Sequence, residues 1–282
     1  MNRQKSFLNE EATLYLVATP IGNLSELTPR AIEILESVDV IAAEDTRTTS
    51  KLLSHFNIHT KLMAHHLHNE KESTKGLIKL LEANNNIALV SDAGYPVLSD
   101  PGQQLVNAVI EAGFNVVPIS GANAAINAVV ASGIAAQPFT FYGFMGSSEK
   151  ERIKTLTELK DFPFTLIFYE APHRIKKTLT NMLDILGDRK ICLAKELTKR
   201  YEEFIRGNIS EIIEICDELK GEMVIVVEAG QKEEVSVSPQ LLKKKIDQMI
   251  SEGYSTKDAI KSVAKEYGIS KNDLYNDYHG LN

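Results

Sequence analysis

The sequence has no tryptophan and only two cysteines, and neither of the two common glycine-rich phosphate-binding motifs occurs in it. Cys192 and Cys216 lie in apolar stretches without paired spacing, which favours buried thiols over a disulfide or a metal site. This cysteine usage fits a reducing compartment, so we expect a cytoplasmic protein. The absence of GxxxxGK[ST] and of GxGxxG argues against a ligand that is held through its phosphates.

Long apolar runs and an excess of positive charge are also missing. No stretch of the 282 residues approaches the roughly 18 apolar residues that cross a bilayer, and the polar residues 1–11 do not resemble a signal peptide. The 31 basic and 38 acidic residues give a formal net charge of −7, which argues against a protein that coats nucleic acid non-specifically. At 43% hydrophobic residues, the chain can build the cores of two domains.

Three apolar, strand-like runs in the first half of the chain end in turns of small residues. The runs and their turns are 14–18 with 19–23, 87–90 with 91–96, and 115–119 with 120–123. In an α/β sheet, ligands bind outside the carboxyl ends of the strands, and small residues let the backbone come close to them. The sequence therefore predicts a small-molecule pocket that is built mostly of main chain.

Strand and helix patterns alternate from residue 13 onward, which predicts a mainly parallel, covered sheet. A second set of strands follows, expected near 139–144, 165–169, 190–195, 200–207 and 222–228. A polar stretch at 231–239 reads as a linker. We therefore expect an α/β fold of three parts: an N-terminal α/β domain at 12–133, a second α/β domain at 134–230, and a helical module at 240–282.

The C-terminal module carries clear helix signals. Ser255 and Thr256 start a helix, Gly268 ends it, and Ser270 caps the next one, a pattern that resembles a helix-turn-helix. Its lysines are nearly balanced by acidic residues. The sequence leaves RNA contact and plain helical packing equally open as roles for this module.

Five longer motifs stand in a fixed order along the first two domains. They are Val17-Ala18-Thr19-Pro20-Ile21-Gly22-Asn23-Leu24, Ala43-Glu44-Asp45-Thr46-Arg47, Ser91-Asp92-Ala93-Gly94 with Ser99-Asp100-Pro101-Gly102, Tyr169-Glu170-Ala171-Pro172-His173-Arg174, and Lys195-Glu196-Leu197-Thr198-Lys199. Together they resemble the bacterial 16S ribosomal RNA (cytidine-2′-O)-methyltransferases of the tetrapyrrole-methylase-like superfamily. The resemblance implies a cofactor cleft between two α/β domains, S-adenosylmethionine as methyl donor and a homodimer. It also implies that the substrate is the ribose 2′-hydroxyl of a decoding-centre cytidine in the small ribosomal subunit.

The resemblance assigns the cofactor to the small-residue turns and to the ends of second-domain strands. The residues it implies are Pro20, Asp92, Ala93, Gly94, Ser120, Gly121, Ala122, Tyr169, Glu170, Met223 and Val224. Residues 120–122 are expected to open a helix whose N–H groups meet the ligand carboxylate. S-adenosylmethionine has no phosphate, which agrees with the missing phosphate-binding motifs.

Methyl transfer to a ribose requires alignment of the two reactants and loss of a proton from a weakly acidic hydroxyl. The candidate catalytic residues follow predicted strands and are Glu44, Asp45, Arg47, Lys195 and Glu196, and Glu170 is a further candidate. Glu44 or Asp45 is expected to act as base or to orient Arg47. Lys195 is an alternative base if burial lowers its pKa. The sequence does not select among them.

Basic residues near the predicted strand ends suggest a track for RNA phosphates, with scattered solvated charges as the alternative. These are Arg47, Lys51, His173, Arg174, Lys199 and Arg200. His65-His66-Leu67-His68 is expected to form a polar loop near the substrate, and no metal site is expected. The acidic total charge favours an assembled subunit over free RNA as substrate. The sequence leaves two alternative functions: C-methylation of a tetrapyrrole, and a non-catalytic protein that binds S-adenosylmethionine and contacts nucleic acid.

Overall fold

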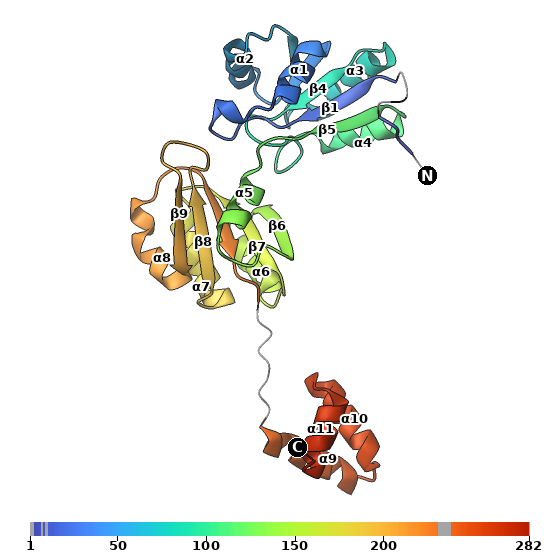
Figure 1. The fold of residues 1–282 in the computed structure, drawn as a ribbon, viewed down its shortest axis with the longest axis vertical. Helices are drawn as coiled ribbons and strands as arrows, with labels where there is room; N and C mark the ends of the chain where they lie inside the picture. The colour runs from blue at the N-terminus through green and yellow to red at the C-terminus, as the bar shows by residue number, and fades with distance from the viewer. Residues whose placement is uncertain (1–2, 7, 9–10, 231–237, 282) are drawn as a thin grey trace. The chain divides into compact units, whose positions relative to one another are not determined.

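The computed structural model describes residues 3–6, 8, 11–230 and 238–281. Contacts divide the chain into two compact units, residues 1–230 and 231–282. The first unit contains two five-stranded sheets, each with its own helices (Figure 1). The predicted linker at 231–239 lies mostly outside the described residues. Among these, no helix is long and apolar enough to span a membrane.

The first sheet is entirely parallel and has the strand order β3-β2-β4-β1-β5. Its elements are β1 (Thr13–Val17), the 3₁₀ turn η1 (Leu24–Glu26), α1 (Pro29–Ser37), β2 (Val40–Ala43), α2 (Thr46–His55), β3 (Lys61–Ala64), α3 (Glu70–Glu82), β4 (Ile87–Val90), α4 (Gln103–Glu111) and β5 (Asn115–Ile119). Alternate strand residues face opposite helix layers, with α1 and α2 on one side of the sheet and α3 and α4 on the other. The prediction of a parallel, covered sheet is confirmed.

The second sheet is mixed and has the order β6-β7-β10-β8-β9, in which only β6 and β7 are parallel. Its elements are α5 (Ala124–Ala131), β6 (Phe139–Phe144), α6 (Glu149–Leu159), β7 (Thr165–Glu170), α7 (Ile175–Leu186), β8 (Lys190–Lys195), β9 (Glu203–Asn208), α8 (Ile209–Ile215), η2 (Cys216–Glu218) and β10 (Met223–Val227). All five expected strands are present. Both cysteines are buried free thiols, as predicted.

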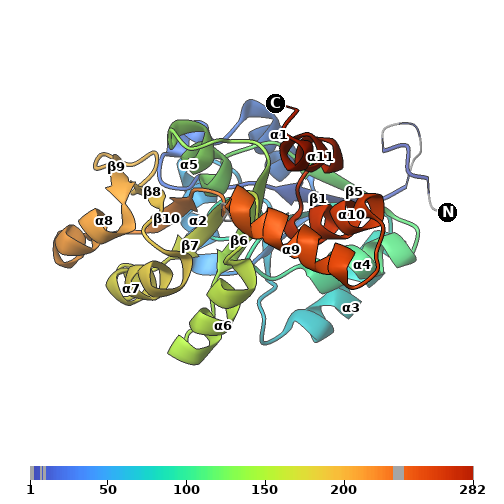
Figure 2. The ribbon, with the colours of Figure 1, turned by 90° about the horizontal axis from the view of Figure 1, so that it is seen from below.

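The second sheet is covered on both faces. Helices α6, α7 and α8 pack on one face, while α5 covers the other (Figure 2). The buried residues of α5 on that face are Ala125, Ala128 and Val129. By packing, α5 therefore belongs with the second sheet, although the predicted boundary at residue 133 assigns it to the first domain. The boundary itself stays a prediction.

Local capping signals explain where several helices begin. The Thr28 hydroxyl accepts a hydrogen bond from the Ala31 N–H at 3.2 Å, and Pro29 occupies the first helical position of α1. The sequence analysis missed β3, whose four residues include an exposed Lys61. A short edge strand with little alternation leaves only a weak sequence signal.

The second unit is a three-helix module of α9 (Pro239–Ser251), α10 (Thr256–Tyr267) and α11 (Lys271–His279). Ser255 caps α10, Gly268 ends it in the left-handed conformation, and Ser270 caps α11. These boundaries confirm the predicted helix signals. The three helices share one apolar core, which includes Leu242, Ile246, Ile260, Val263 and Leu274.

Candidate functional site

Two loops that follow the central strands β1 and β4 are joined directly. The backbones of Thr19 and Gly94 exchange hydrogen bonds of 2.9 and 3.0 Å, and the Thr19 hydroxyl donates to the Ser91 carbonyl oxygen at 3.1 Å. Small residues are required here because the turns after β1 and β5 approach each other closely: a Cβ on Gly121 would lie 2.8 Å from the Ala18 Cβ. The three small-residue turns therefore meet at the carboxyl edge of the first sheet, as expected.

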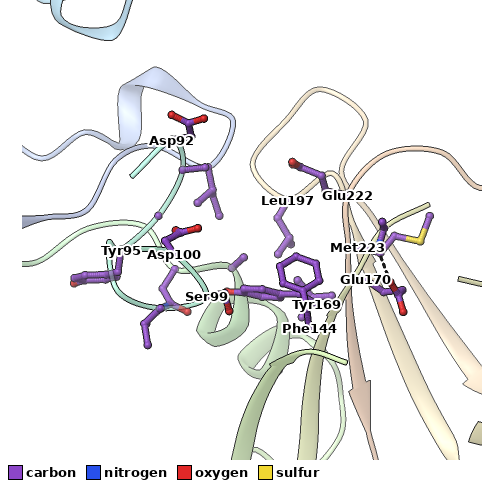
Figure 3. Close-up of a pocket in the computed structure, with 18 of the residues that line it drawn as sticks. Asp92, Tyr95, Ser99, Asp100, Phe144, Tyr169, Glu170, Leu197, Glu222 and Met223 are labelled. Atoms are coloured by element: carbon purple, nitrogen blue, oxygen red, sulfur yellow. Dashed lines mark hydrogen bonds between the residues drawn. The ribbon is translucent and has the colours of Figure 1, made fainter. Parts of the chain in front are cut away.

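A cavity of about 320 Å³ opens at this edge and continues to the second sheet (Figure 3). Its lining residues are Ile21, Glu44, Asp92, Ala93, Gly94, Tyr95, Leu98, Ser99, Asp100, Asn123, Ala124, Phe144, Tyr169, Glu170, Ala171, Ala194, Leu197, Glu222, Met223 and Val224. The volume is that of a pocket for a small organic ligand or cofactor.

Three carboxylates from the first domain line the cavity. Burial is the main cause that raises the pKa of Glu44, Asp92 and Asp100. For Asp100 the pKa rises to about 6, with further contributions from the negative charges of Glu44 and Asp92 and an opposing hydrogen bond from Ser91. The repulsion among these three carboxylates favours either protonation of one of them or the binding of a cation.

The opposite wall comes from the second sheet and is largely apolar. Tyr169 packs edge-on against Phe141 and Phe144, with ring centroids 4.9 and 5.4 Å apart. Burial raises the pKa of the Tyr169 hydroxyl, so this side chain is neutral at physiological pH. Met223 and Val224, on the adjacent strand β10, lie beside it in register with Glu170 and Tyr169. The cavity thus combines an acidic side with an aromatic and aliphatic side.

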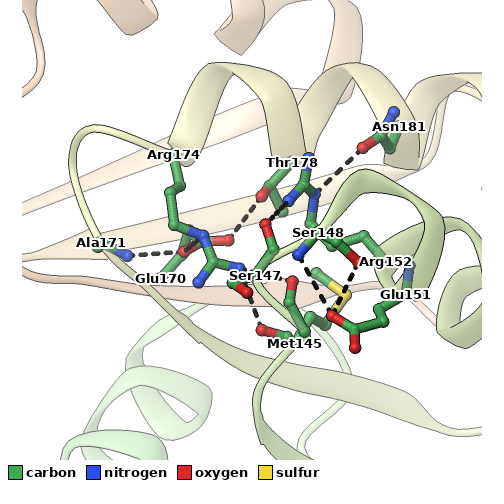
Figure 4. A network of polar contacts seen from close by, with 11 residues as sticks. Met145, Ser147, Ser148, Glu151, Arg152, Glu170, Ala171, Arg174, Thr178 and Asn181 are labelled. Carbon is green, nitrogen blue, oxygen red and sulfur yellow. Dashed lines mark hydrogen bonds and ion pairs between the residues drawn. The ribbon is translucent and has the colours of Figure 1, made fainter.

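Glu170 is held by its own domain (Figure 4). Its buried carboxylate accepts hydrogen bonds from the Thr178 hydroxyl at 2.6 Å and the Ala171 N–H at 2.9 Å, and pairs with Arg174 at 3.1 Å. Arg174 also donates to the carbonyl oxygens of Met145 and Gly146, both at 3.0 Å. This network fastens the end of β7 to the start of α7 and to the turn after β6. It gives Glu170 and Arg174 a structural function besides any contact with ligands.

The turn that carries Asp100 is anchored by a residue outside the cavity. Val97 and Ser99 have φ angles of +77° and +69°, a conformation that side chains disfavour. The buried carboxylate of Glu70 accepts a hydrogen bond from the Gly102 N–H at 3.0 Å. Asp100 belongs to the Ser99–Gly102 motif, for which the sequence predicts no individual role. Glu70 was not predicted, because an acid in the first turn of a helix resembles a surface residue.

The other predicted catalytic residues lie outside the cavity lining. Asp45 caps α2 and pairs with Arg47 at 2.7 Å, which holds the pKa of the Asp45 carboxyl well below its usual range. Lys195 pairs with Glu203 at 2.8 Å. Glu196 pairs with Lys199 at 3.0 Å. Of the five predicted catalytic residues, all of which the structure describes, Glu44 alone lines the cavity.

Seven of the eleven predicted cofactor residues line the cavity, and neighbours in the same turns take the place of the other four. Asp92, Ala93, Gly94, Tyr169, Glu170, Met223 and Val224 line it, whereas Pro20 and residues 120–122 do not, and Ile21, Asn123 and Ala124 stand in their place. Helix α5 begins after Asn123, whose side chain accepts from the Ile126 N–H at 2.9 Å. The expectation that residues 120–122 open this helix is therefore wrong, because Asn123, a favourable cap, follows them and sets the start of the helix.

The residues predicted to contact RNA differ in their exposure. Arg47, Lys51, His173 and Arg200 are exposed, whereas Arg174 and Lys199 are engaged inside the protein. Lys199 bridges Glu196 and Glu222 and packs where a Cβ on Gly22 would lie, 2.4 Å from its Cγ. It thereby joins the loop after β8 to the loop after β1.

His65 differs from the exposed loop residue that its sequence suggests. The side chain is 1% exposed at the end of β3, and its Nδ1 lies 2.8 Å from the Ser73 hydroxyl. Burial lowers the pKa of this imidazole, so His65 is a neutral core residue at physiological pH. Leu67 and His68 in the same segment are exposed.

Comparisons with known proteins agree with this architecture. Residues 13–213 match the model of the tetrapyrrole (corrin/porphyrin) methylases. Among solved structures, uroporphyrin-III-C-methyltransferase from Thermus thermophilus covers 82% of this chain and 99% of its own, with a TM-score of 0.53 at 18% identity. A putative diphthine synthase from Entamoeba histolytica covers 79% of this chain and 94% of its own, with a TM-score of 0.57 at 16% identity. These structures show the same fold.

Closer relatives extend over the full chain. The ribosomal RNA small subunit methyltransferase I of Bacillus subtilis (strain 168) is 49% identical over 99% of both chains. The protein of the same name from Streptococcus pyogenes serotype M3 (strain ATCC BAA-595 / MGAS315) is 45% identical over 100% of both. The alignment with these relatives includes the C-terminal helices as well as both sheets. This chain therefore belongs to the tetrapyrrole (corrin/porphyrin) methylase family, among the methyltransferases related to ribosomal RNA small subunit methyltransferase I.

Proposed function

We propose that this methyltransferase uses S-adenosylmethionine to methylate the ribose 2′-hydroxyl of a decoding-centre cytidine in the 16S ribosomal RNA of the small subunit. The observation that carries the proposal is the cavity between the two sheets, with its acidic side formed by Glu44, Asp92 and Asp100. The full-length similarity to relatives named for small-subunit rRNA methylation supports the substrate. The choice of the 2′-oxygen and of a cytidine as the target rests on the resemblance that the five sequence motifs carry.

The chemistry of the cavity suits the proposed methyl donor. S-adenosylmethionine supplies an activated methyl group on a positively charged sulfonium and also carries an ammonium group. Carboxylates whose pKa values are raised by burial and mutual repulsion gain stability from such a cation. The apolar wall of Tyr169, Met223 and Val224 offers a surface for the uncharged adenine. Because S-adenosylmethionine has no phosphate, the cavity needs no phosphate-binding residue.

We assign proton removal to Glu44 among the predicted catalytic residues. It lines the cavity, and its raised pKa makes it a stronger base than an ordinary carboxylate. Asp45 is a weaker candidate because its pairing with Arg47 lowers its pKa. The exposed guanidinium of Arg47, with 87% of its side chain accessible, is available to hold an RNA phosphate near the cavity mouth.

A transfer assay tests the proposal. Purified protein, labelled S-adenosylmethionine and small ribosomal subunits from a strain that lacks this protein should give label in 16S rRNA, and Glu44→Gln should lower kcat far more than it changes cofactor affinity. Tetrapyrrole substrates are run in parallel. Label in a tetrapyrrole alone would establish the rival C-methylation. Tight cofactor binding without transfer to any substrate would instead support a non-catalytic binding protein.

A further inference from the structure

Three lysines form a stripe along one face of helix α10. Lys257, Lys261 and Lys265 are spaced four residues apart, so successive side chains lie about 6 Å apart along the helix axis. All three are exposed. No ion-pair partner occurs for any of them in the described parts of the chain. The stripe is therefore a row of exposed positive charges without described ion-pair partners in a protein whose net charge is −7.

The opposite face of α10 fixes the direction of this stripe. Ala259, Ile260, Val263 and Ala264 are buried in the apolar core that α10 shares with α9 and α11. The lysines therefore point away from the core of their own module. Because they lie outside the apolar core of the module, we expect their neutralisation to leave its fold intact.

Several acidic side chains of the module are engaged elsewhere. Asp247 accepts a hydrogen bond from the Tyr278 hydroxyl at 2.5 Å, Asp258 accepts one from the Ser255 hydroxyl at 2.6 Å, and Glu266 pairs with Lys245. Each of these contacts orients a carboxylate toward the module's own helices. These three carboxylates thus have partners within the module, whereas no ion pair of the stripe lysines occurs among the described residues.

We propose that the stripe of Lys257, Lys261 and Lys265 binds phosphate groups of the RNA substrate and gives the enzyme a second attachment site besides the cavity. The inference rests on the proposed function for the identity of the polyanion. A regular row of ammonium groups suits the repeated charges of a nucleic-acid backbone, which lysine binds as a point charge without reading sequence. In a helix-turn-helix, moreover, the first helix crosses the backbone, and α10 holds that place in the α10–α11 pair.

A second site on a linked module raises affinity without touching the chemistry, because the second contact becomes intramolecular. Substitution of the stripe should therefore act on RNA binding and leave methyl-donor binding unchanged. It should also reduce the salt dependence of binding, since each lost phosphate contact lowers the slope of log K against log salt by about 0.7 to 0.9.

The test uses the full-length protein and the triple variant Lys257→Gln/Lys261→Gln/Lys265→Gln. Equilibrium binding to small subunits and to protein-free 16S rRNA is measured across a salt series. We expect weaker binding by about tenfold or more, and a slope reduced by about 2 to 3 on both ligands. Binding of S-adenosylmethionine, measured by calorimetry, should be unchanged.

Two double variants, each of which removes two lysines, distinguish the effect of the stripe on RNA binding from the effect of a changed net charge. Lys257→Gln/Lys261→Gln should weaken RNA binding several-fold, whereas Lys243→Gln/Lys244→Gln, which removes two exposed lysines of α9, should have little effect. An equal loss in both pairs, or an unchanged salt slope in the triple variant, would overturn the inference. A loss confined to assembled subunits would also overturn it, because it would indicate a ribosomal protein as the partner. Methyl transfer by the unsubstituted enzyme reports on the proposed function independently of these binding measurements.

Discussion

The carboxylate of Glu70, at the start of α3, accepts a hydrogen bond from the Gly102 N–H at 3.0 Å, at the start of α4. Glu70 is only 7% exposed, and Gly102 has a φ of +130°. The contact caps α4 from outside its own segment and fixes the turn that brings Ser99 and Asp100 to the cavity. Glu70 is therefore a positioning residue that does not line the site itself.

Replacing Glu70 tests this arrangement. Glu70→Ala leaves a buried N–H without its partner, so we expect a loss of about 1 to 3 kcal/mol in unfolding free energy. Cofactor binding should weaken by about tenfold or more, because the turn becomes mobile. Glu70→Gln keeps an oxygen acceptor and should retain most of both properties. Urea unfolding and calorimetry check the result, and an equal loss in both variants would contradict a role based on this acceptor.

Asp100 should give cofactor binding a dependence on pH. Its pKa is raised to about 6, so protonation removes a negative charge from the cavity as the pH falls through that value. Affinity for the cationic cofactor is expected to decline below about pH 6 and to be lower in Asp100→Asn at neutral pH. Isothermal titration between pH 5 and pH 8 measures this. A pH profile identical in the variant and the unsubstituted protein would show that Asp100 is not the responsible group.

The same carboxyl should destabilise the ligand-free protein at neutral pH. A group with a raised pKa binds more protons in the folded state than in the unfolded state between about pH 4 and pH 6, so stability falls as the pH rises through that window. Above it, Asp100→Asn removes the penalty and should raise the unfolding free energy by about 1 kcal/mol, after allowance for partial solvent screening. Thermal unfolding at pH 5 and pH 8 tests the sign. A variant that is less stable at pH 8 would contradict it.

The pair of Glu170 and Arg174 should matter more for stability than for chemistry. Glu170→Ala leaves Arg174 facing a buried, unpaired site, and we expect a loss of about 3 kcal/mol in unfolding free energy. A double-mutant cycle with Arg174→Ala, measured by urea unfolding, separates the coupling from the two single losses. Additive losses would show that the two side chains act independently.

Two glycines should respond to alanine in opposite directions. At Gly121 the new Cβ would meet the Cβ and carbonyl oxygen of Ala18 at 2.8 and 3.2 Å, so Gly121→Ala should lower both stability and cofactor affinity. At Gly76, inside α3, no atom lies within 4 Å of the new Cβ, and Gly76→Ala should stabilise by about 0.5 to 1 kcal/mol. Paired unfolding curves and calorimetry compare them, and a Gly121→Ala protein with full stability and affinity would contradict the close packing of the turns.

Features with local causes could be predicted from the sequence. Thr28 with Pro29, and Ser255 with Gly268, mark helix ends through contacts within one or two turns, and the alternation of elements identified the first sheet as parallel. Asp92 and Tyr169 could be assigned to the site through the motifs that carry the family resemblance, and both line the cavity. Glu70 and Asp100 could not be assigned in this way. Their roles depend on an approach between α3 and the turn before α4 that no sequence spacing encodes.

Side-chain roles that depend on a contact with a residue distant in the sequence could not be predicted either. The bonds of Arg174 to Glu170 and to two carbonyl oxygens, and of Lys199 to Glu196 and Glu222, arise from contacts across the fold. Their positive charge and their position near predicted strand ends placed both side chains on the predicted RNA-binding track. The turn containing Asn123 shows the reverse case, since an asparagine three residues before the Ile126 N–H is a readable cap that the prediction passed over.

The most direct test of the central claim is the chemical position of the transferred methyl group. Small subunits labelled by the enzyme are extracted, and their 16S rRNA is hydrolysed in alkali, which cleaves next to a free 2′-hydroxyl but not next to a methylated one. We predict that the label is recovered in a single alkali-resistant dinucleotide that begins with cytidine. Label recovered in ordinary mononucleotides, as expected for methylation of a base, would contradict the account.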